Sequence, residues 1–467
     1  MITDLRPYAE YKESGLPWLG QVPGHWGLSR SKRLFSARKD LASSEDVQLS
    51  ATQAYGVIPQ SEFEEKVGRR VVKISMHLEK RRHVEKDDFV ISMRSFQGGI
   101  ERAWASGAIR SSYVVLKPES GVNVGFFAYL FKSHSYIRAL QATADFIRDG
   151  QDLNFSNFCG VDLPTVPLAE QAAIARFLNY ANGLLERAIR AKRKVITLLN
   201  EQRQAIIHSA VTCGLDPSVP LKASGIPWLG DIPQHWEVRR GKYLFQPIDV
   251  RSAKGVEELL TVSSSDGIVP RSTKTVMMFK AASYAGHKLC WPGDLVINSL
   301  WAWAKGLGFS SHHGIVSTAY GVYRPRPTYS KHAPYWHELL RSPAYDWEFQ
   351  TRSRGIWKSR LQLTDDSFLA MRIIVPPEEE AVGIVQRIRV STSGLRSAIS
   401  RLEREIELLR EYRSRLVADV VTGKLDVREA AEGLPDLKDD ASSGETADEV
   451  TGVEELEDAS GRKEAQA

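Results

Sequence analysis

The feature that most constrains how this chain can fold is an internal duplication with a constant offset of 210 residues. Residues 12–36 and 222–246 are identical at fourteen of twenty-five aligned positions. The same offset recurs near the far end of each block, where Val211 and Thr212 match Val421 and Thr422. Solenoid repeats have periods of about 20 to 50 residues. This longer period therefore predicts two domain-sized units, each with a core of its own.

The two copies agree less closely between their ends. Residues 88–92 (DFVIS) correspond to residues 294–298 (DLVIN), and residues 109–118 correspond to residues 315–325 with one inserted residue. The latter two segments are β-branched and aromatic runs that end at a proline. Such runs are typical of strands, so we expect equivalent strands in the two units.

Each unit ends in a long segment without proline that carries an apolar seam at alternating steps of four and three residues. This spacing is typical of coiled-coil helices. Polar residues interrupt the seams only at Lys192, Arg203 and Arg413. Antiparallel pairing within one chain would bury both seams, whereas packing of each seam on its own globular domain is the alternative. The apolar seam residues are Leu185, Ile189, Ile196, Leu199 and Ile206 in the first helix and Leu395, Ile399, Leu402, Ile406, Leu409 and Leu416 in the second.

These patterns predict an α+β chain in which two similar α/β domains are separated by a pair of long antiparallel coiled-coil helices, with a pseudo-twofold internal repeat. The expected boundaries are residues 1–166 for the first domain, 167–216 for the first helix, 217–376 for the second domain, 377–428 for the second helix and 429–467 for a tail.

Charge is distributed unevenly along the chain. The tail contains thirteen acidic and three basic residues, a local charge of −10, so the formal net charge of +5 corresponds to +15 on residues 1–428. We expect the tail to be disordered. The basic body is typical of a protein that binds a polyanion, with an ordinary basic soluble protein as the alternative.

Two basic domains held apart by a helical spacer suit a DNA duplex that is read at two half-sites. The seam from Leu185 to Ala210 covers 26 residues, or about 40 Å at roughly 1.5 Å per residue. That length is close to one turn of DNA, about 34 to 36 Å. Because the two domains differ in sequence, the expected target is bipartite and asymmetric.

The chain resembles the specificity subunits (HsdS) of type I restriction-modification systems. The motifs that carry the resemblance are GLPWLGQVPGHW and GIPWLGDIPQHW, VPLAEQAAIARFL and VPPEEEAVGIVQRI, and VTCGLD and VTGKLD. They cover about residues 10–428 and leave out only the tail.

The resemblance implies a non-catalytic DNA-binding subunit with one target-recognition domain for each half-site. Because no apolar run is long enough for a membrane span and the opening residues lack the apolar stretch of a signal peptide, we expect a cytoplasmic protein. It also implies assembly with two methyltransferase subunits and, for cleavage, with ATP-dependent restriction subunits. No cofactor would be bound by this chain, and S-adenosylmethionine, ATP and Mg²⁺ would be used by the partner subunits.

Motifs for catalysis on DNA are absent from the sequence. It lacks the Asn/Asp-Pro-Pro-aromatic tetrapeptide of adenine methyltransferases and the GxxxxGK[ST] phosphate loop. Glu64 and Lys66 fit half of a nuclease motif, but matches this short are common by chance. The three cysteines have no disulfide or zinc spacing, and we expect no metal site. Two rival functions remain open: a coiled-coil adaptor that does not read DNA, and a self-sufficient DNA-modifying enzyme.

Candidate DNA contacts are basic, amide and aromatic residues expected outside strands, chiefly in the loops that follow residues 88–92 and 294–298. The alternative is a solvated charged face for each basic cluster and a core position for the two tryptophans. Glycines in the first loop would allow close backbone approach. The candidates are Arg69, Arg70, Lys73, Arg81, Arg82, Arg94, Gln97, Arg148 and Gln151 in the first domain and Arg271, Lys274, Trp301, Trp303, Lys305, Arg352, Arg354, Lys358 and Arg360 in the second.

The aromatic and histidine residues of the repeated motif are expected to be structural, because residues that read two different sequences should differ between the copies. Docking of a methyltransferase subunit is their functional alternative. These residues are Trp18, His25 and Trp26 and their copies Trp228, His235 and Trp236.

Overall fold

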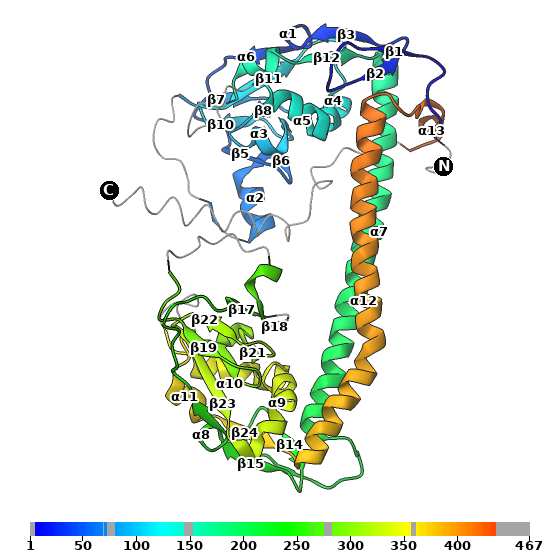
Figure 1. The fold of residues 1–467 in the computed structure, drawn as a ribbon. Helices are drawn as coiled ribbons and strands as arrows, with labels where there is room; N and C mark the ends of the chain where they lie inside the picture. The colour runs from blue at the N-terminus through cyan, green and yellow to red at the C-terminus, as the bar shows by residue number, and fades with distance from the viewer. Residues whose placement is uncertain are drawn as a thin grey trace. The chain divides into compact units, whose positions relative to one another are not determined.

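The computed structural model describes residues 5–68, 70–71, 80–143, 153–264, 266–274, 283–355 and 361–435 (Figure 1). It separates into unit 1, made of Met1–Lys192 and Arg404–Ala467, and unit 2, made of Arg193–Glu403. Both boundaries fall inside long helices, α7 (Leu168–Cys213) and α12 (Glu378–Val421). Each unit therefore consists of a globular domain and a part of both helices.

Unit 1 is built on a four-stranded antiparallel sheet in the order β4-β11-β8-β9. Its strands are β4 (Phe35–Arg38), β11 (Val114–Pro118), β8 (Phe89–Ile91) and β9 (Glu101–Arg102). Further antiparallel pairs are β1 (Tyr11–Glu13) with β2 (Gln21–Pro23), β3 (Gly27–Arg30) with β12 (Asp162–Thr165), β5 (Leu49–Thr52) with β6 (Gly56–Pro59), and β7 (Arg82–Val84) with β10 (Gly107–Ile109). The short helices are α1 (Ser31–Leu34), α2 (Gln60–Val67), α3 (Ser95–Gly98), α4 (Val124–Lys132), α5 (His134–Gln141) and α6 (Phe155–Cys159).

Unit 2 repeats this arrangement with a four-stranded antiparallel sheet in the order β16-β23-β20-β21. Its strands are β16 (Phe245–Pro247), β23 (Tyr320–Pro325), β20 (Leu295–Asn298) and β21 (Leu307–Phe309). Further pairs are β13 (Leu221–Ala223) with β14 (Asp231–Pro233), β15 (Glu237–Arg240) with β24 (Arg372–Val375), β17 (Leu260–Ser263) with β18 (Gly267–Pro270), and β19 (Lys288–Cys290) with β22 (Gly314–Val316). The short helices are α8 (Gly241–Leu244), η2 (Arg271–Thr273), η3 (Ala302–Ala304), η4 (Pro327–His332), α9 (Ala333–Leu340), α10 (Pro343–Arg352) and α11 (Asp365–Leu369).

The repeated strand β8, and β20 as far as Ile297, are apolar because both faces of the sheet are covered. In unit 1, Phe89 and Ile91 belong to the main core, whereas Val90 between them belongs to a second, smaller core. Successive side chains of a strand point to opposite faces, so this division follows from the period of two. Leu295, Val296 and Ile297 divide between two cores in the same way in unit 2.

The main core of each unit also holds one end of each long helix. In unit 1, Phe35 packs edge to face on Phe89, with ring centroids 5.7 Å apart, and the same core includes Ile174 of α7 and Val420 of α12. Full burial of one such phenylalanine contributes about 1.5 to 3 kcal/mol to folding. The helix ends are thus fixed to the globular domain of unit 1. The seam residues among them, Leu416 and Val420, belong to α12, which follows the other domain in sequence, so they do not match the alternative of a seam packed on its own domain.

Beyond these ends, α7 and α12 contact each other (Figure 1). In unit 1, Arg413 donates to Glu186 at 3.2 Å and Lys192 donates to Glu405 at 2.5 Å, so the helices run in opposite directions. These ion pairs involve two of the three polar seam positions, Lys192 and Arg413. The apolar seam residues are all buried or half-buried, whereas Val195 and Leu198, which lie off the seam, are exposed. None of the helices among the described residues has a stretch long and apolar enough to cross a membrane.

The two ends of the described chain meet in unit 1. The backbone N–H of Asp426 donates to the carbonyl of Arg6 at 2.8 Å, and the hydroxyl of Tyr11 donates to the carbonyl of Lys424 at 2.9 Å. A short helix, α13 (Arg428–Glu432), then buries Ala431 in the main core. The expected disordered tail therefore does not begin at residue 429, because residues 429–435 are structured. Residues 436–467 lie outside the described residues.

Candidate nucleic-acid interface

Three segments that are distant in sequence form one surface in unit 1: the β5–β6 turn, the loop from Ser92 to Ile100 that contains α3, and helix α5. The amide of Gln53 in the turn donates to the carbonyl of Arg94 at 3.3 Å. The amide of Gln141 at the end of α5 donates to the carbonyl of Phe96 at 2.7 Å. We call this the loop surface of unit 1.

The corresponding loop surface of unit 2 consists of the β17–β18 turn, the loop from Ser299 to Gly306 that contains η3, and helix α10 with the described residues 353–355 and 361–363 that follow it. The N–H of Leu363 donates to the carbonyl of Ser299 at 2.9 Å. The Nζ of Lys305 lies 3.2 Å from the carboxylate of Asp346 on α10. Folding therefore brings the tryptophan loop, residues 299–306, close to the segment that contains Arg352 and Arg354. The sequence indicated these two segments separately.

Six of the predicted contacts lie outside the described residues. The other twelve are described, and five of these belong to the loops themselves: Arg94, Gln97, Trp301, Trp303 and Lys305. The six that lie outside are Arg69, Lys73, Arg148, Gln151, Lys358 and Arg360.

The two tryptophans of unit 2 form a stacked pair on the loop surface. Their rings lie 5.7 Å apart between centroids with an angle of 20° between planes. The indole N–H of Trp303 donates to the carbonyl of Leu300 at 3.0 Å, which fixes the inner ring. Trp301 is 53% exposed and Trp303 is half-buried, so neither occupies the core position considered as the alternative. The pair offers an aromatic face beside Lys305, as base-stacking sites do.

Three of the predicted basic contacts also bind groups of the protein itself. Arg82 lies in strand β7, against the expectation of a loop position, and its Nε donates to the carbonyl of Ser111 at 3.2 Å. The neighbouring Arg81 binds the side chain of Gln48, and Arg352 pairs with the buried Glu348. The acceptors of Arg81 and Arg82 come from segments that are distant in sequence, whereas Glu348 lies one helical turn before Arg352 on α10.

Three further predicted cations have more open positions. Arg70 and Arg354 are exposed, and Arg271 is half-buried in η2. Lys274, which follows η2, pairs with Asp266.

The glycines of the first loop serve internal packing. A Cβ atom on Gly98 would lie 2.5 Å from the side chain of Gln53, and one on Gly99 would lie 2.2 Å from the carbonyl oxygen of Phe131. Gly99 also has a φ of 81°, which disfavours other residues. The close backbone approach predicted for these glycines is thus made to their own domain.

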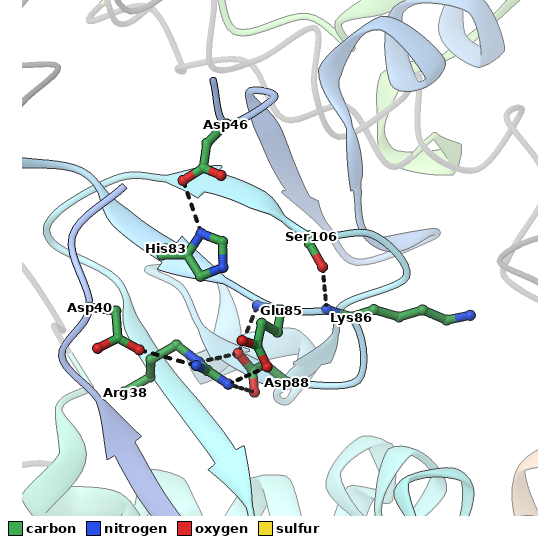
Figure 2. Close-up of polar contacts among 8 residues, drawn as sticks. All are labelled: Arg38, Asp40, Asp46, His83, Glu85, Lys86, Asp88 and Ser106. Atoms are coloured by element: carbon green, nitrogen blue, oxygen red, sulfur yellow. Dashed lines mark hydrogen bonds and ion pairs between the residues drawn. The ribbon is translucent and has the colours of Figure 1, made fainter. Parts of the chain in front are cut away.

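An ion-pair cluster beside the sheet of unit 1 escaped the sequence reasoning (Figure 2). The guanidinium of Arg38 on β4 reaches Asp88 at 2.7 Å, Glu85 at 2.9 Å and Asp40 at 3.1 Å. Burial raises the pKa of Asp88, while the hydrogen bond from Arg38 opposes that rise. Asp88 also accepts from the N–H of Glu85, so it closes the turn before β8.

Unit 2 neutralises the equivalent carboxylate from a different strand. Asp294 pairs with Arg324 of β23 at 2.7 Å, whereas Asp88 pairs with Arg38 of β4. Both arginines therefore stabilise their own domain by neutralising an aspartate, and neither was among the predicted DNA contacts. In the same part of unit 1, His83 lies 2.9 Å from Asp46, and the Lys86 side chain extends away from the cluster (Figure 2). Lys86 is exposed and is a cation that the sequence reasoning missed.

The repeated His-Trp motif is anchored by one glutamate in each unit. The buried indole of Trp26 donates to Glu170 at 2.9 Å, and His25 lies 2.7 Å from the same carboxylate. In unit 2, Trp236 donates to Glu380 at 3.0 Å, and His235 lies 2.6 Å from Glu380. The glutamates follow the same offset of 210 residues, a signal present in VPLAEQ and VPPEEE. Each glutamate ties the start of a long helix to the start of a domain.

Unit 2 also contains a cationic cavity of about 580 Å³ away from the predicted residues. Three arginines line it, together with Ser224, Val238 and Tyr243. Arg239 is paired with Glu237 at 2.6 Å, and Arg372 donates to the carbonyl of Gly225 at 3.0 Å. The aligned positions of unit 1 include Leu28, Ser29 and Asp162, so the cavity lining is not repeated.

No family model and no curated protein matches the chain. Three solved structures match the chain in a comparison of structures. One, from work on complex assembly and conformational transition of the type I R-M system, is 13% identical, covers 86% of this chain and 99% of its own, and has a TM-score of 0.57. The HsdS subunit from Thermoanaerobacter tengcongensis is 14% identical over 86% of this chain and 98% of its own, with a TM-score of 0.41. The type I S subunit from M. genitalium is 14% identical over 89% and 97%, with a TM-score of 0.33. The first likeness shows that the chain shares the fold of a component of a type I restriction-modification system.

Proposed function

We propose that this chain is the DNA-specificity subunit of a type I restriction-modification complex and reads a bipartite, asymmetric duplex site. The observation that carries the proposal is the contrast between its two units. Their sheets have the same strand order and their Trp-Glu anchors repeat, yet their loop surfaces present different chemistry. A repeated scaffold with divergent loops suits two different half-sites on one polymer.

In this proposal the loop surfaces provide the base contacts and nearby cations contact phosphates. Arg94 and Gln97 offer unit 1 a guanidinium and an amide, the groups that pair with guanine and adenine edges in the major groove. Unit 2 offers the stacked indoles of Trp301 and Trp303 and the ammonium of Lys305. The remaining predicted contacts, including those outside the described residues, belong to the same proposal.

The paired helices act as the spacer that sets the distance between the two half-sites, and the two recognition units are related by a pseudo-twofold axis. The antiparallel ion pairs of unit 1 support this arrangement, because they give the two helices one fixed register. The repeated segments are the natural docking sites for two copies of one methyltransferase subunit. A partner present twice requires the same surface twice.

Chemistry belongs to the partner subunits in this proposal. The two methyltransferase subunits use S-adenosylmethionine, and the restriction subunits use ATP and Mg²⁺ for cleavage, while this cytoplasmic chain supplies sequence recognition alone. The sequence supports this division, since it contains no methyltransferase tetrapeptide and no phosphate-binding loop.

Methylome sequencing tests the proposal directly. A host that carries this gene together with its methyltransferase partner should show a split adenine-methylated motif, and the motif should vanish when the gene is deleted. The purified complex should also bind a duplex of that motif with an affinity that falls steeply as salt is added.

Two outcomes would favour the rival functions. Duplex affinity that is absent at low salt would indicate the coiled-coil adaptor. Methyl transfer by this chain alone would indicate a self-sufficient enzyme.

A further inference from the structure

A lysine at the end of α4 joins two parts of the loop surface of unit 1. Lys132 donates from Nζ to the carbonyl of Gln53 in the β5–β6 turn at 3.3 Å. The same ammonium pairs with the buried carboxylate of Glu101, the first residue of β9 after the loop. Burial raises the pKa of Glu101 to about 7, and the charge of Lys132 opposes that rise.

An arginine at the end of α9 does the same in unit 2. Arg341 donates from Nη1 to the carbonyl of Ser263, the last residue of β17, at 3.3 Å and from Nη2 to the carbonyl of Ser264, in the β17–β18 turn, at 2.6 Å. Its Nη1 also binds the carbonyl of Leu307, the first residue of β21 after the tryptophan loop.

The positions involved are equivalent in the two units although the residues differ. The carbonyls of Gln53 and Ser264 are equivalent, because each belongs to the first residue after the first strand of its hairpin, β5 in unit 1 and β17 in unit 2. Glu101 and Leu307 each lie thirteen residues after the aspartate that opens DFVIS or DLVIN. Both cations lie at the end of equivalent helices, α4 and α9, and each precedes a serine whose hydroxyl donates to a carbonyl of the last helical turn, Ser133 in unit 1 and Ser342 in unit 2.

Two different side chains with different second partners thus make the same connection. In unit 1 the connection is made by a lysine that pairs with a carboxylate. In unit 2 it is made by an arginine that binds carbonyls, so different chemistry meets the same structural requirement. The requirement they share is a fixed position of the turn relative to the strand that ends the loop. Base discrimination depends on such fixed positions, because a contact group displaced by a fraction of an ångström loses its preference for one base edge.

We propose that Lys132 and Arg341 are positioning residues that hold each loop surface in its reading conformation, and that each therefore controls specificity at one half-site only. The inference rests on the proposed function. Neither side chain needs to touch DNA for this role.

For unit 2 the variant is Arg341→Met, because the hydrogen-bond partners of Arg341 are carbonyls and the nearby carboxylate of Glu338 keeps the charges of Arg203 and Arg396. In unit 1, Lys132→Met would strand the carboxylate of Glu101, so the matched variant is Lys132→Met combined with Glu101→Gln. Lys132→Arg and Arg341→Lys keep a cation in place and serve as conservative controls.

The experiment measures the affinity of the complex with its methyltransferase partner for three duplexes: the full site and two sites with one base pair changed in one half. For Arg341→Met we expect the preference for the correct base in the half-site of unit 2 to fall roughly tenfold, near the cost of one mismatched pair. The other half-site should keep its preference. The double variant in unit 1 should show the reverse, and the conservative controls should retain most of the discrimination.

Hydrogen exchange of the free complex gives a second readout that needs no DNA. Amides of residues 263–264 and 300–307 should exchange faster in Arg341→Met, while those of unit 1 should not change. Unchanged exchange together with unchanged discrimination would overturn the positioning role and leave the proposed function standing. Equal weakening toward all duplexes with a reduced salt dependence would also overturn it, because that behaviour identifies a phosphate contact. A wild-type complex without sequence preference would refute the proposed function itself, while the exchange result would still decide the positioning role.

Discussion

At the scale of single residues, the polar side chains of this chain divide into those used by the fold and those left at the surface. Arg38 and Arg324 come from different strands yet neutralise equivalent aspartates, so the carboxylate is the shared feature and the arginine is interchangeable. By contrast, Trp301 is held in a stacked pair with most of its outer face uncovered. Side chains of the second kind are the ones expected to affect a partner without affecting the fold.

Replacement of Trp301 by alanine tests the aromatic face of unit 2. We expect Trp301→Ala to weaken binding of the full duplex site roughly tenfold, because stacking on one base contributes about 1 to 3 kcal/mol. The thermal stability of the chain should change little, since the ring is exposed. Titration of the purified chain with labelled duplex measures the effect. Trp228→Ala removes another exposed indole from the repeated motif and should leave duplex affinity unaltered.

His337 predicts a pH dependence of stability in unit 2. Burial lowers the pKa of His337 from 6.5 to about 4, and the charge of Arg341 acts in the same direction. Its Nδ1 accepts from the N–H of Phe309 at 3.2 Å, which requires the neutral ring. Between pH 6.5 and pH 4 the unfolded chain binds more protons than the native chain, so the free energy of unfolding falls as the pH is lowered through this range.

The variant His337→Asn retains an acceptor near Phe309 but cannot be protonated there. We expect its unfolding free energy to lose a pH-dependent contribution of at most on the order of 3 kcal/mol between pH 6.5 and pH 4. Urea denaturation across that range measures it. The exposed His134 of unit 1 supplies the control, and an unaltered slope in His337→Asn with a changed slope in His134→Asn would contradict the assignment.

At the scale of elements, the long helices have two tasks along their length. Their ends contribute Ile174 and Val420 to the core of unit 1, whereas their middle parts contact each other through the seam and its ion pairs. Glu186 with Arg413 and Lys192 with Glu405 fix which residues face each other. The register that these pairs define makes a matched shortening of both helices possible.

Deletion of one heptad from each helix tests the spacer. Removing residues 189–195 and 404–410 takes out segments that face each other in this register and keeps the seams aligned. The helices lose about 10 Å at roughly 1.5 Å per residue, so the gap between half-sites should shorten by about three base pairs. The helical phase changes by only about 20° per heptad. Methylome sequencing with the variant measures the gap, and a gap of the original length would refute the spacer role.

At the scale of the whole chain, the two units differ in how the end of a long helix is joined to the start of the domain. In unit 1 this connection consists of non-covalent contacts rather than of a continuous chain. In unit 2 the segment from Cys213 to Leu221 runs continuously from α7 into the domain. In unit 1 the same step is made by Asp426 against Arg6 and by Tyr11 against Lys424. The guanidinium of Arg428 also lies over the ring of Tyr8. The hydroxyl of Tyr8 donates to Glu170 at 2.7 Å.

This closure predicts that the chain tolerates circular permutation. A short flexible linker from residue 435 to residue 5, with new ends placed between Asp216 and Pro220, should give a folded chain that directs methylation to the same motif. The exposed segment at the new ends carries few buried groups, and such sites accept new termini well. Methylome sequencing and a thermal melt measure the outcome. A matched permutant opened within β20 should not fold, since that strand lies inside the sheet.

The sequence by itself determined the parts of this protein that repeat or follow a period. The 210-residue offset established the two units, the steps of four and three located both long helices, and the apolar runs before proline located β11 and β23 at the same place in their sheets. These features depend on near neighbours along the chain, so a linear pattern records them.

Only the tertiary structure decided which charged and polar groups are free and which are bound. Arg81, a predicted DNA contact, also binds Gln48, and the contacts of Lys132 and Arg341 had no signal in the sequence. Lys132 and Arg341 each join segments more than thirty residues apart through a single ammonium or guanidinium group. A hydrogen bond of that kind depends on the meeting of two distant backbones, which no local periodicity specifies.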